Sequence, residues 1–211
     1  MQKKLKFQDI KEKIKNIEKI GEGWRASVYK GIFEDKVLSF KVALSDLHKH
    51  PIQKEGIILQ QVNKHGIGSP LRFSGEDFIA YDYIDGKPLI EVINQSNYLN
   101  LINQLLEQSF ILDKLKIDKG EMHRPYTNVL VDKDLKLYLI DFERATKSLK
   151  PQNVLNVTQF ILRGKERTED LLKLLKEYKL NQSEDNFLRL KDYLMNILVA
   201  GAGFEPATSG L

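Results

Sequence analysis

One glutamate sets the strongest constraint on how this chain folds. Residues 51–64 have the pattern of an amphipathic helix, in which Pro51 suits the first position and Gly66 suits the residue beyond the last. Glu55 shares the apolar face of this helix with three later residues, Ile58, Leu59 and Val62. A carboxylate that points into a core is costly unless a cation meets it. The fold must therefore bring a basic side chain to this helix.

The strand predicted before this helix offers such a cation. Bulky side chains alternate onto one face of residues 37–44, namely Leu38, Phe40, Val42 and Leu44. Lys41 lies on the opposite face between Ser39 and Ala43, whose small side chains leave room beside the ammonium. We therefore predict an ion pair between Lys41 and Glu55. The alternative is an exposed lysine on an edge strand, which is common.

A glycine pair lies further towards the N-terminus. Gly21 and Gly23 are separated by one residue and stand between two strand-like segments. Such a turn lets the backbone approach a phosphate closely and offers it N–H groups. A dinucleotide-binding fingerprint needs a helix after the glycines, whereas Val28 continues a strand, which argues against a Rossmann turn. Taken alone, the pair is more typical of an ordinary hairpin turn than of a phosphate-binding loop.

A second hairpin, in the later half, carries two candidate metal ligands. Residues 129–131 and 137–142 are apolar and flank the turn residues 132–134. Asn128 precedes the first strand and Asp141 ends the second, so we expect the amide oxygen and the carboxylate to lie close together. A few hard oxygen ligands of this type suit Mg²⁺ that is held partly by nucleotide phosphates.

The remaining pattern predicts an α+β fold. Strands are expected within residues 20–44, with turns at Gly31 and at residues 34–36, and within residues 70–85 around a turn at 74–77. Helices are expected at residues 98–115 and from 151 to 199, where Ser183 is the candidate N-cap of the last one. The order predicts a small antiparallel sheet holding one helix, followed by a mostly helical part with an embedded hairpin.

Composition excludes several classes of function. The chain has 211 residues and no cysteine, which rules out disulfides, thiolate metal sites and cysteine nucleophiles. No apolar run approaches the roughly 20 residues that span a bilayer, and no apolar segment follows the first lysines as in a secretory signal. We therefore expect a cytoplasmic protein with no membrane contact.

The net charge of +4 is concentrated at the N-terminus. Residues 1–20 contain seven lysines and three acidic residues, so the other 191 residues sum to zero. Ile10, Ile14 and Ile17 recur at helical spacing, which favours a docked amphipathic helix with a solvated lysine face. The alternative is a weak contact with RNA or a ribonucleoprotein.

The chain resembles the protein kinase-like fold in the order of its motifs. These are the glycine loop, Lys41, Glu55, Asn128 and Asp141-Phe142. The resemblance covers residues 18–165 and is closest to the minimal RIO-type kinases and a group of archaeal predicted Ser/Thr protein kinases. It implies two lobes: an N-lobe at 1–81 with the leading helix, and a reduced helical C-lobe at 82–200. Residues 201–211 have no apolar periodicity and are predicted to be a disordered tail.

The resemblance also implies roles for individual residues. Nucleotide would be bound by Gly21, Gly23 and Val28 of the glycine loop, by Lys41, and by the backbone of Asp82, Tyr83 and Ile84. In this family Glu55 would orient Lys41 on the phosphates, and Asn128 and Asp141 would hold Mg²⁺. The implied cofactors are ATP and Mg²⁺.

Three departures from the family pattern bear on activity. Ala26 replaces the third glycine of the loop, and Glu143 replaces the glycine of Asp-Phe-Gly, which removes easy access to positive φ. The position of the catalytic aspartate holds His123, with Glu121 two residues earlier. Either side chain is able to accept a hydroxyl proton. The family's Ala-Pro-Glu element and a long activation loop have no counterpart after Asp141.

Two functions follow from this pattern. The first is ATP- and Mg²⁺-dependent phosphoryl transfer to a hydroxyl, on Ser or Thr or another acceptor, by an atypical minimal serine/threonine protein kinase. The alternative is a pseudokinase, a nucleotide-binding scaffold for a protein or RNA partner.

Overall fold

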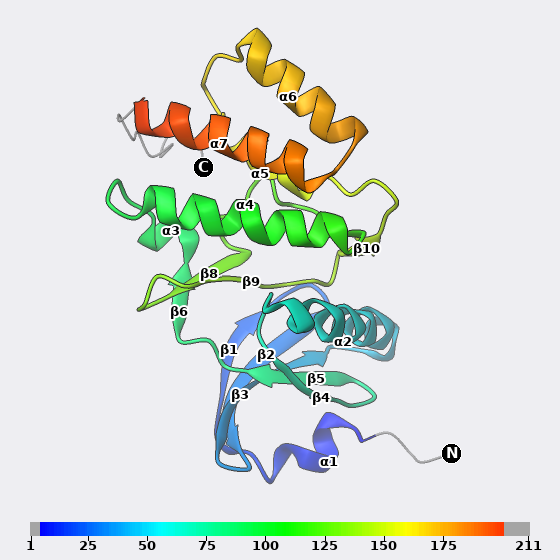
Figure 1. Cartoon of the computed structure of the whole chain (residues 1–211). Coiled ribbons are helices and arrows are strands. Elements are labelled where there is room, and N and C mark those ends of the chain that lie inside the picture. Colours follow the sequence, from blue (N-terminus) through cyan, green and yellow to red (C-terminus); the bar gives the residue numbers. More distant parts are fainter. Residues whose placement is uncertain (1–4, 201–211) are drawn as a thin grey trace. The chain divides into compact units, whose positions relative to one another are not determined.

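The computed structural model describes residues 5–200 and has an α+β fold (Figure 1). The chain divides into two units, which we call the first and the second unit. The first comprises Met1–Asp85 and Tyr138–Ala145, and the second comprises Gly86–Leu137 and Thr146–Leu211. The predicted tail at 201–211 lies outside the described residues. Among residues 5–200, no helix has the length and apolar character needed to cross a membrane.

The first unit is built on a five-stranded antiparallel sheet with strand order β1-β2-β3-β5-β4. The strands are β1 (Lys15–Glu22), β2 (Ala26–Phe33), β3 (Lys36–Ala43), β4 (Leu71–Ser74) and β5 (Phe78–Asp82). The helical elements are α1 (Phe7–Lys11), α2 (Lys49–Val62) and the 3₁₀ turns η1 (Asp46–His48) and η2 (Asn63–His65). The predicted helix and the turn at 74–77 are confirmed, but α2 begins at Lys49, two residues before Pro51. Gly66 has the left-handed conformation of a cap, at the end of η2 and not of α2.

Strand alternation gives this sheet two different faces. One carries a cluster of buried side chains together with α1: Phe7, Ile10, Ile14, Leu38, Phe40, Phe78 and Ala80. The residues between them in sequence, including Ser39, Lys41 and Ile79, point to the other face, where α2 packs. Lys41 is thereby directed at the helix that carries Glu55. Figure 1 shows α1 and α2 on opposite sides of the sheet.

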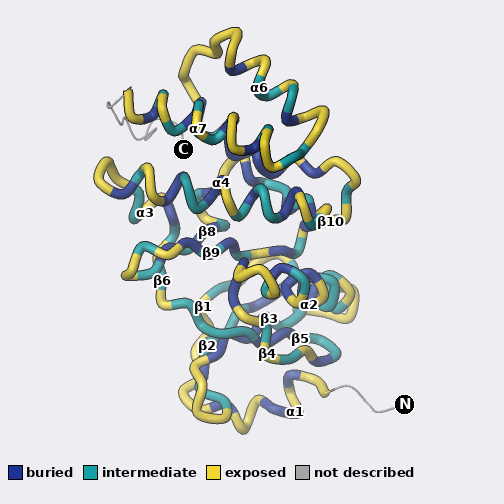
Figure 2. The backbone as a smooth tube through the Cα atoms, viewed as in Figure 1, coloured by how far each residue is buried: buried dark blue, intermediate teal, exposed yellow. Residues whose placement is uncertain are grey.

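The leading helix is shorter than predicted. It ends at Lys11, and β1 begins at Lys15, so the expected helical stretch through Ile17 is wrong. Ile10 and Ile14 are buried on the sheet and Ile17 is half-buried, so these side chains contribute to the core of the first unit. Figure 2 shows buried as well as exposed residues along α1. The spacing suits a helix, but packing against the sheet overrides it, as tertiary contacts commonly do.

The predicted turn at Gly31 is also wrong, because Gly31 lies inside β2 opposite Leu38. A Cβ atom at Gly31 would lie 2.3 Å from Ile14 Cγ2, so the glycine is needed for close approach of the N-terminal segment. The turn predicted at residues 34–36 is confirmed, with φ of 48° at Glu34 and 60° at Asp35. Two successive positive φ angles are typical of the tight turns that join antiparallel strands.

The second unit is mostly helical. Its helices are α3 (Leu89–Val92), α4 (Tyr98–Lys114), α5 (Asn153–Ile161), α6 (Glu169–Leu180) and α7 (Glu184–Ala200). Its strands are β6 (Gly86–Pro88), β7 (Ile117–Asp118), β8 (Val129–Asp132) and β10 (Thr146–Lys147), and β9 (Leu137–Leu139) begins in this unit. The predicted helix at 98–115 and the turn after β8 are confirmed. Ser183 caps α7 as predicted, since its Oγ accepts from Asn186 N–H at 3.3 Å.

We predict that Gly31→Ala lowers the free energy of unfolding by about 1–3 kcal/mol, because the added methyl group overpacks the contact with Ile14. Chemical denaturation measures this change. Gly23→Ala is the matched control, since a Cβ atom there would meet its nearest neighbour at 3.8 Å. Equal stabilities of the two variants would contradict our account of Gly31.

Candidate active site

The predicted ion pair is present in the first unit. Lys41 Nζ lies 2.7 Å from Glu55 Oε2, and the two side chains are only 10% and 4% exposed. Lys41 comes from β3, the central strand of the sheet, and Glu55 from the sheet-facing side of α2. The ammonium therefore meets the carboxylate that the apolar helix face would otherwise bury alone.

The segment Asp141–Glu143 extends this pair into a cluster. Lys41 Nζ lies 3.0 Å from Asp141 Oδ1 and 3.6 Å from Glu143 Oε2. Glu143 Oε1 in turn accepts from Arg25 Nη1 at 2.6 Å. Two cations and three carboxylates gather here, and when all are ionised the cluster carries a net charge of −1.

The backbone of this segment is held by the same glutamate. Phe142 N–H donates to Glu55 Oε1 at 3.1 Å, and the Phe142 side chain is fully buried. Asp141 has a φ of 58°, a left-handed conformation that costs a non-glycine residue roughly 1–3 kcal/mol. Such strain persists where surrounding contacts determine the backbone, and it is enriched at functional sites. Glu55 thus orients both Lys41 and Asp141.

Burial and charge oppose each other at the central pair. Burial lowers the pKa of the Lys41 ammonium, but the attraction of Glu55 and Asp141 exceeds that effect, so the pKa is raised overall. Burial also raises the pKa of the Glu55 carboxyl, and the Lys41 ammonium opposes this. We interpret the pair as ionised, because both Glu55 oxygens lie against donors, Lys41 Nζ and Phe142 N–H.

Asp141 best fits a metal ligand in the first unit. Oxygen atoms of Glu55, Asp141 and Glu143 lie within 4.8 Å of one another. Glu55 is committed to Lys41 and Phe142, whereas the Asp141 side chain is 49% exposed and has one oxygen on Lys41. A carboxylate that is about half exposed to solvent suits Mg²⁺, which usually keeps several waters and takes one or two protein carboxylates.

The other metal-ligand candidate and both candidate bases lie in the second unit. Asn128 Nδ2 donates to Glu121 Oε2 at 3.0 Å, so the structure brings these two residues together. Glu121 has a φ of 54° and its carbonyl accepts from Arg124 N–H at 2.9 Å. His123 is exposed. Of the two candidate bases, Glu121 is therefore the one fixed beside Asn128.

A buried carboxylate that the sequence analysis missed supports this segment. Asp113 of α4 accepts two hydrogen bonds from Asn153, from N–H at 3.0 Å and Nδ2 at 2.7 Å. It also accepts from Val154 N–H at 3.3 Å and Tyr178 Oη at 2.8 Å. Asn153 then donates to the Ile117 carbonyl and accepts from Lys119 N–H. The network fixes the backbone that leads into Glu121.

The proposed nucleotide-binding residues lie in two parts of the first unit. Gly21 pairs with Val28 across β1 and β2, and Gly23 N–H donates to the Ala26 carbonyl at 2.8 Å, which closes a tight turn. At the end of β5, the N–H groups of Asp82 and Tyr83 donate to the carbonyls of Pro70 and Val37. An adenine contact in this segment would therefore use its carbonyls or the backbone of Ile84.

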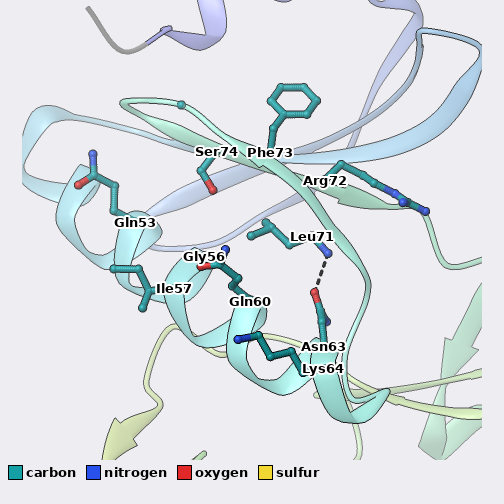
Figure 3. A pocket seen from close by; sticks show the side chains of 11 residues that line it. Gln53, Gly56, Ile57, Gln60, Asn63, Lys64, Leu71, Arg72, Phe73 and Ser74 are labelled. Carbon is teal, nitrogen blue, oxygen red and sulfur yellow. Dashed lines mark hydrogen bonds between the residues drawn. The ribbon is translucent and has the colours of Figure 1, made fainter. Parts of the chain in front are cut away.

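A groove in the first unit lies apart from the ion cluster. It is about 600 Å³ and runs between α2 and the edge strand β4, with Gly56, Ile57, Leu71 and Phe73 among its lining (Figure 3). At one end of the groove, Asn63 Oδ1 accepts a hydrogen bond from Leu71 N–H. The lining includes none of the clustered charges, so we assign the candidate chemistry to the ion cluster and not to the groove.

Comparison with known proteins assigns no family to this chain. No protein-family model matches it, and a search of curated proteins finds no match.

We predict strong energetic coupling between Lys41 and Glu55. Lys41→Met alone should lower the free energy of unfolding by about 3 kcal/mol, because it leaves a buried carboxylate without its cation. A double-mutant cycle with Glu55→Gln, read by chemical denaturation, should give about 1–3 kcal/mol of coupling. The exposed pair Arg189–Glu177, treated in the same way, should couple by under about 1 kcal/mol. Additive effects at Lys41 and Glu55 would contradict a buried ion pair.

We predict a pH-dependent contribution from Asp113. Burial raises the pKa of its carboxyl from 3.8 to about 6. The folded state then binds the proton more tightly than the unfolded state, so this contribution to stability is complete below pH 3.8 and is lost as pH rises through about 6. Relative to Asp113→Asn, the wild type should lose up to about 3 kcal/mol between pH 4 and 7. Parallel stability profiles of the two proteins would contradict the prediction.

Proposed function

We propose that this protein is an ATP- and Mg²⁺-dependent phosphotransferase that acts on hydroxyl groups. In this proposal the two units correspond to the N-lobe and C-lobe of an atypical, minimal serine/threonine protein kinase. The observation that carries it is the contact of one buried lysine, Lys41, with both a helix glutamate and an aspartate from 100 residues later in the chain. A chain that only needed a stable core would do as well with apolar residues at these positions.

The first unit supplies the phosphate-binding groups. Lys41 stays cationic at neutral pH because its pKa is raised, and Glu55 holds its ammonium in place. Lys41 contacts the phosphate oxygens, while the turn at Gly21 and Gly23 offers backbone N–H groups. Asp141 would be the ligand in this unit for Mg²⁺, an ion that would supply neutralisation of the phosphate charge, and Asn128 of the second unit is the other candidate ligand.

The second unit supplies the group that accepts the proton of the attacking hydroxyl. Glu121 is the better candidate on geometry, since its carboxylate is fixed by Asn128, and His123 is the exposed alternative. Phosphoryl transfer depends mainly on positioning and electrostatic stabilisation, so a displaced base does not by itself abolish it. The acceptor is a Ser or Thr hydroxyl or that of another hydroxylated molecule.

The replacement of the family's catalytic aspartate by His123 favours a second candidate, a pseudokinase. In that case the cluster binds nucleotide without transfer, and the protein acts as a scaffold for a protein or RNA partner in the cytoplasm.

Transfer of label from γ-labelled ATP separates the two functions. With Mg²⁺ present, we expect the wild type to label itself or a hydroxyl acceptor. Asp141→Asn should reduce the rate at least about 100-fold, because a ligand for the phosphate-bound metal is lost. The base is then the residue whose substitution, Glu121→Gln or His123→Ala, lowers the rate by about 100-fold or more, and we expect this loss for Glu121→Gln.

Asp134→Asn is the matched control, because it makes the same chemical change at an exposed turn. Nucleotide-induced stabilisation without transfer to any acceptor would favour the scaffold. Labelling that is equal in Asp141→Asn and Asp134→Asn would overturn the proposed enzyme.

A further inference from the structure

Glu143 divides its carboxylate between two cations. Oε1 accepts from Arg25 Nη1 at 2.6 Å, and Oε2 lies 3.6 Å from Lys41 Nζ. Only 16% of its side chain is exposed, so water screens these contacts weakly. The carboxylate thus bridges a guanidinium on the glycine loop and the lysine that the proposed function assigns to phosphate.

The loop that carries Arg25 is fixed independently of this bridge. Gly23 N–H donates to the Ala26 carbonyl, and Leu44 N–H donates to the Arg25 carbonyl at 3.0 Å. The Arg25 side chain itself is 41% exposed. The guanidinium is therefore able to leave Glu143 while the backbone of the loop stays in place.

We propose that Glu143 is an internal anion that a nucleotide phosphate displaces, and that Arg25 and Lys41 together form the phosphate subsite. This inference rests on the proposed nucleotide-binding function and deepens it. A phosphate presents neighbouring oxygens to two cations as a carboxylate does, and a guanidinium binds either group with the same planar donors. Arg25 is thereby a second phosphate-binding cation, beyond the lysine and the loop backbone.

The bridge makes the subsite selective for metal-bound phosphate. With Glu55, Asp141 and Glu143 ionised against two cations, the cluster opposes a free triphosphate by Coulomb repulsion. A triphosphate carrying a divalent cation meets less repulsion. Removing the charge of Glu143 alone brings the cluster to neutrality and releases the Arg25 guanidinium, while Lys41 keeps its contacts with Glu55 and Asp141.

If the ion pair between Arg25 and Glu143 has only a structural role, different effects on nucleotide binding are expected. If the pair only holds the glycine loop in position, removing either partner weakens nucleotide binding. If Glu143 competes with phosphate, removing Glu143 strengthens binding and removing Arg25 weakens it. The signs of the two effects therefore separate the explanations.

The test measures binding of ATP and of inorganic tripolyphosphate to the full chain, first with EDTA and then with Mg²⁺. Trp24, the only tryptophan, is 88% exposed and adjoins Arg25, so its fluorescence reports on the loop, and the shift in melting temperature gives a second readout. With EDTA, Glu143→Gln should bind both ligands about 10-fold more tightly than the wild type. Arg25→Gln should bind them about 10-fold more weakly, and Mg²⁺ should help Glu143→Gln less than the wild type.

Glu18→Gln is the matched control for total charge, since it removes a carboxylate exposed on β1. Weaker binding by both Glu143→Gln and Arg25→Gln, or equal tightening by Glu18→Gln and Glu143→Gln, would overturn the inference. Wild-type binding of Mg²⁺–ATP alongside either result would leave the proposed function standing. Failure of every variant, and of the wild type, to bind Mg²⁺–ATP would overturn both.

Discussion

The first unit depends on one buried ion pair. Lys41 and Glu55 each lie in surroundings where a lone charge would be expelled, so strand β3 and helix α2 have to align until ammonium and carboxylate meet. The second oxygen of Glu55 then fixes the backbone N–H of Phe142. One carboxylate thereby sets the relation of β3, α2 and a segment 87 residues after Glu55, and it brings Asp141 to Lys41.

The sequence was enough to predict this pair, because the rule behind it is energetic. A glutamate on an apolar helix face demands a cation, and only Lys41 stood on the correct strand face. The turn at Gly31 and the long leading helix were mispredicted for a different reason. A glycine looks the same whether it makes a turn or admits Ile14, and apolar residues at helical spacing also suit a chain that packs onto a sheet.

Other parts of the site carried weaker signals. Glu143 was noticed only as a missing glycine, and nothing in its neighbourhood points to Arg25, 118 residues away. Asp113 could have been found, because it follows the buried residues Leu106 and Ser109 at helical spacing, as Glu55 lies with its apolar neighbours. The cost of burying a carboxylate also predicts partners for Asp113, but the partners observed are an amide, a hydroxyl and backbone N–H groups and not a cation, so that argument would have looked for the wrong kind of group.

Both units therefore use a buried helix carboxylate to order a later segment. Apolar side chains of similar volume would make the same packing contacts without the cost of desolvating charge, and such replacements are often neutral or stabilising. Apolar side chains could not fix one position of the 141–143 segment among several similar ones, because dispersion contacts have no preferred direction. Hydrogen bonds to a carboxylate do have a preferred direction. The left-handed backbone at Asp141 requires that kind of directional restraint. The buried charges of this chain are thus better explained by the positions they impose than by the stability they add.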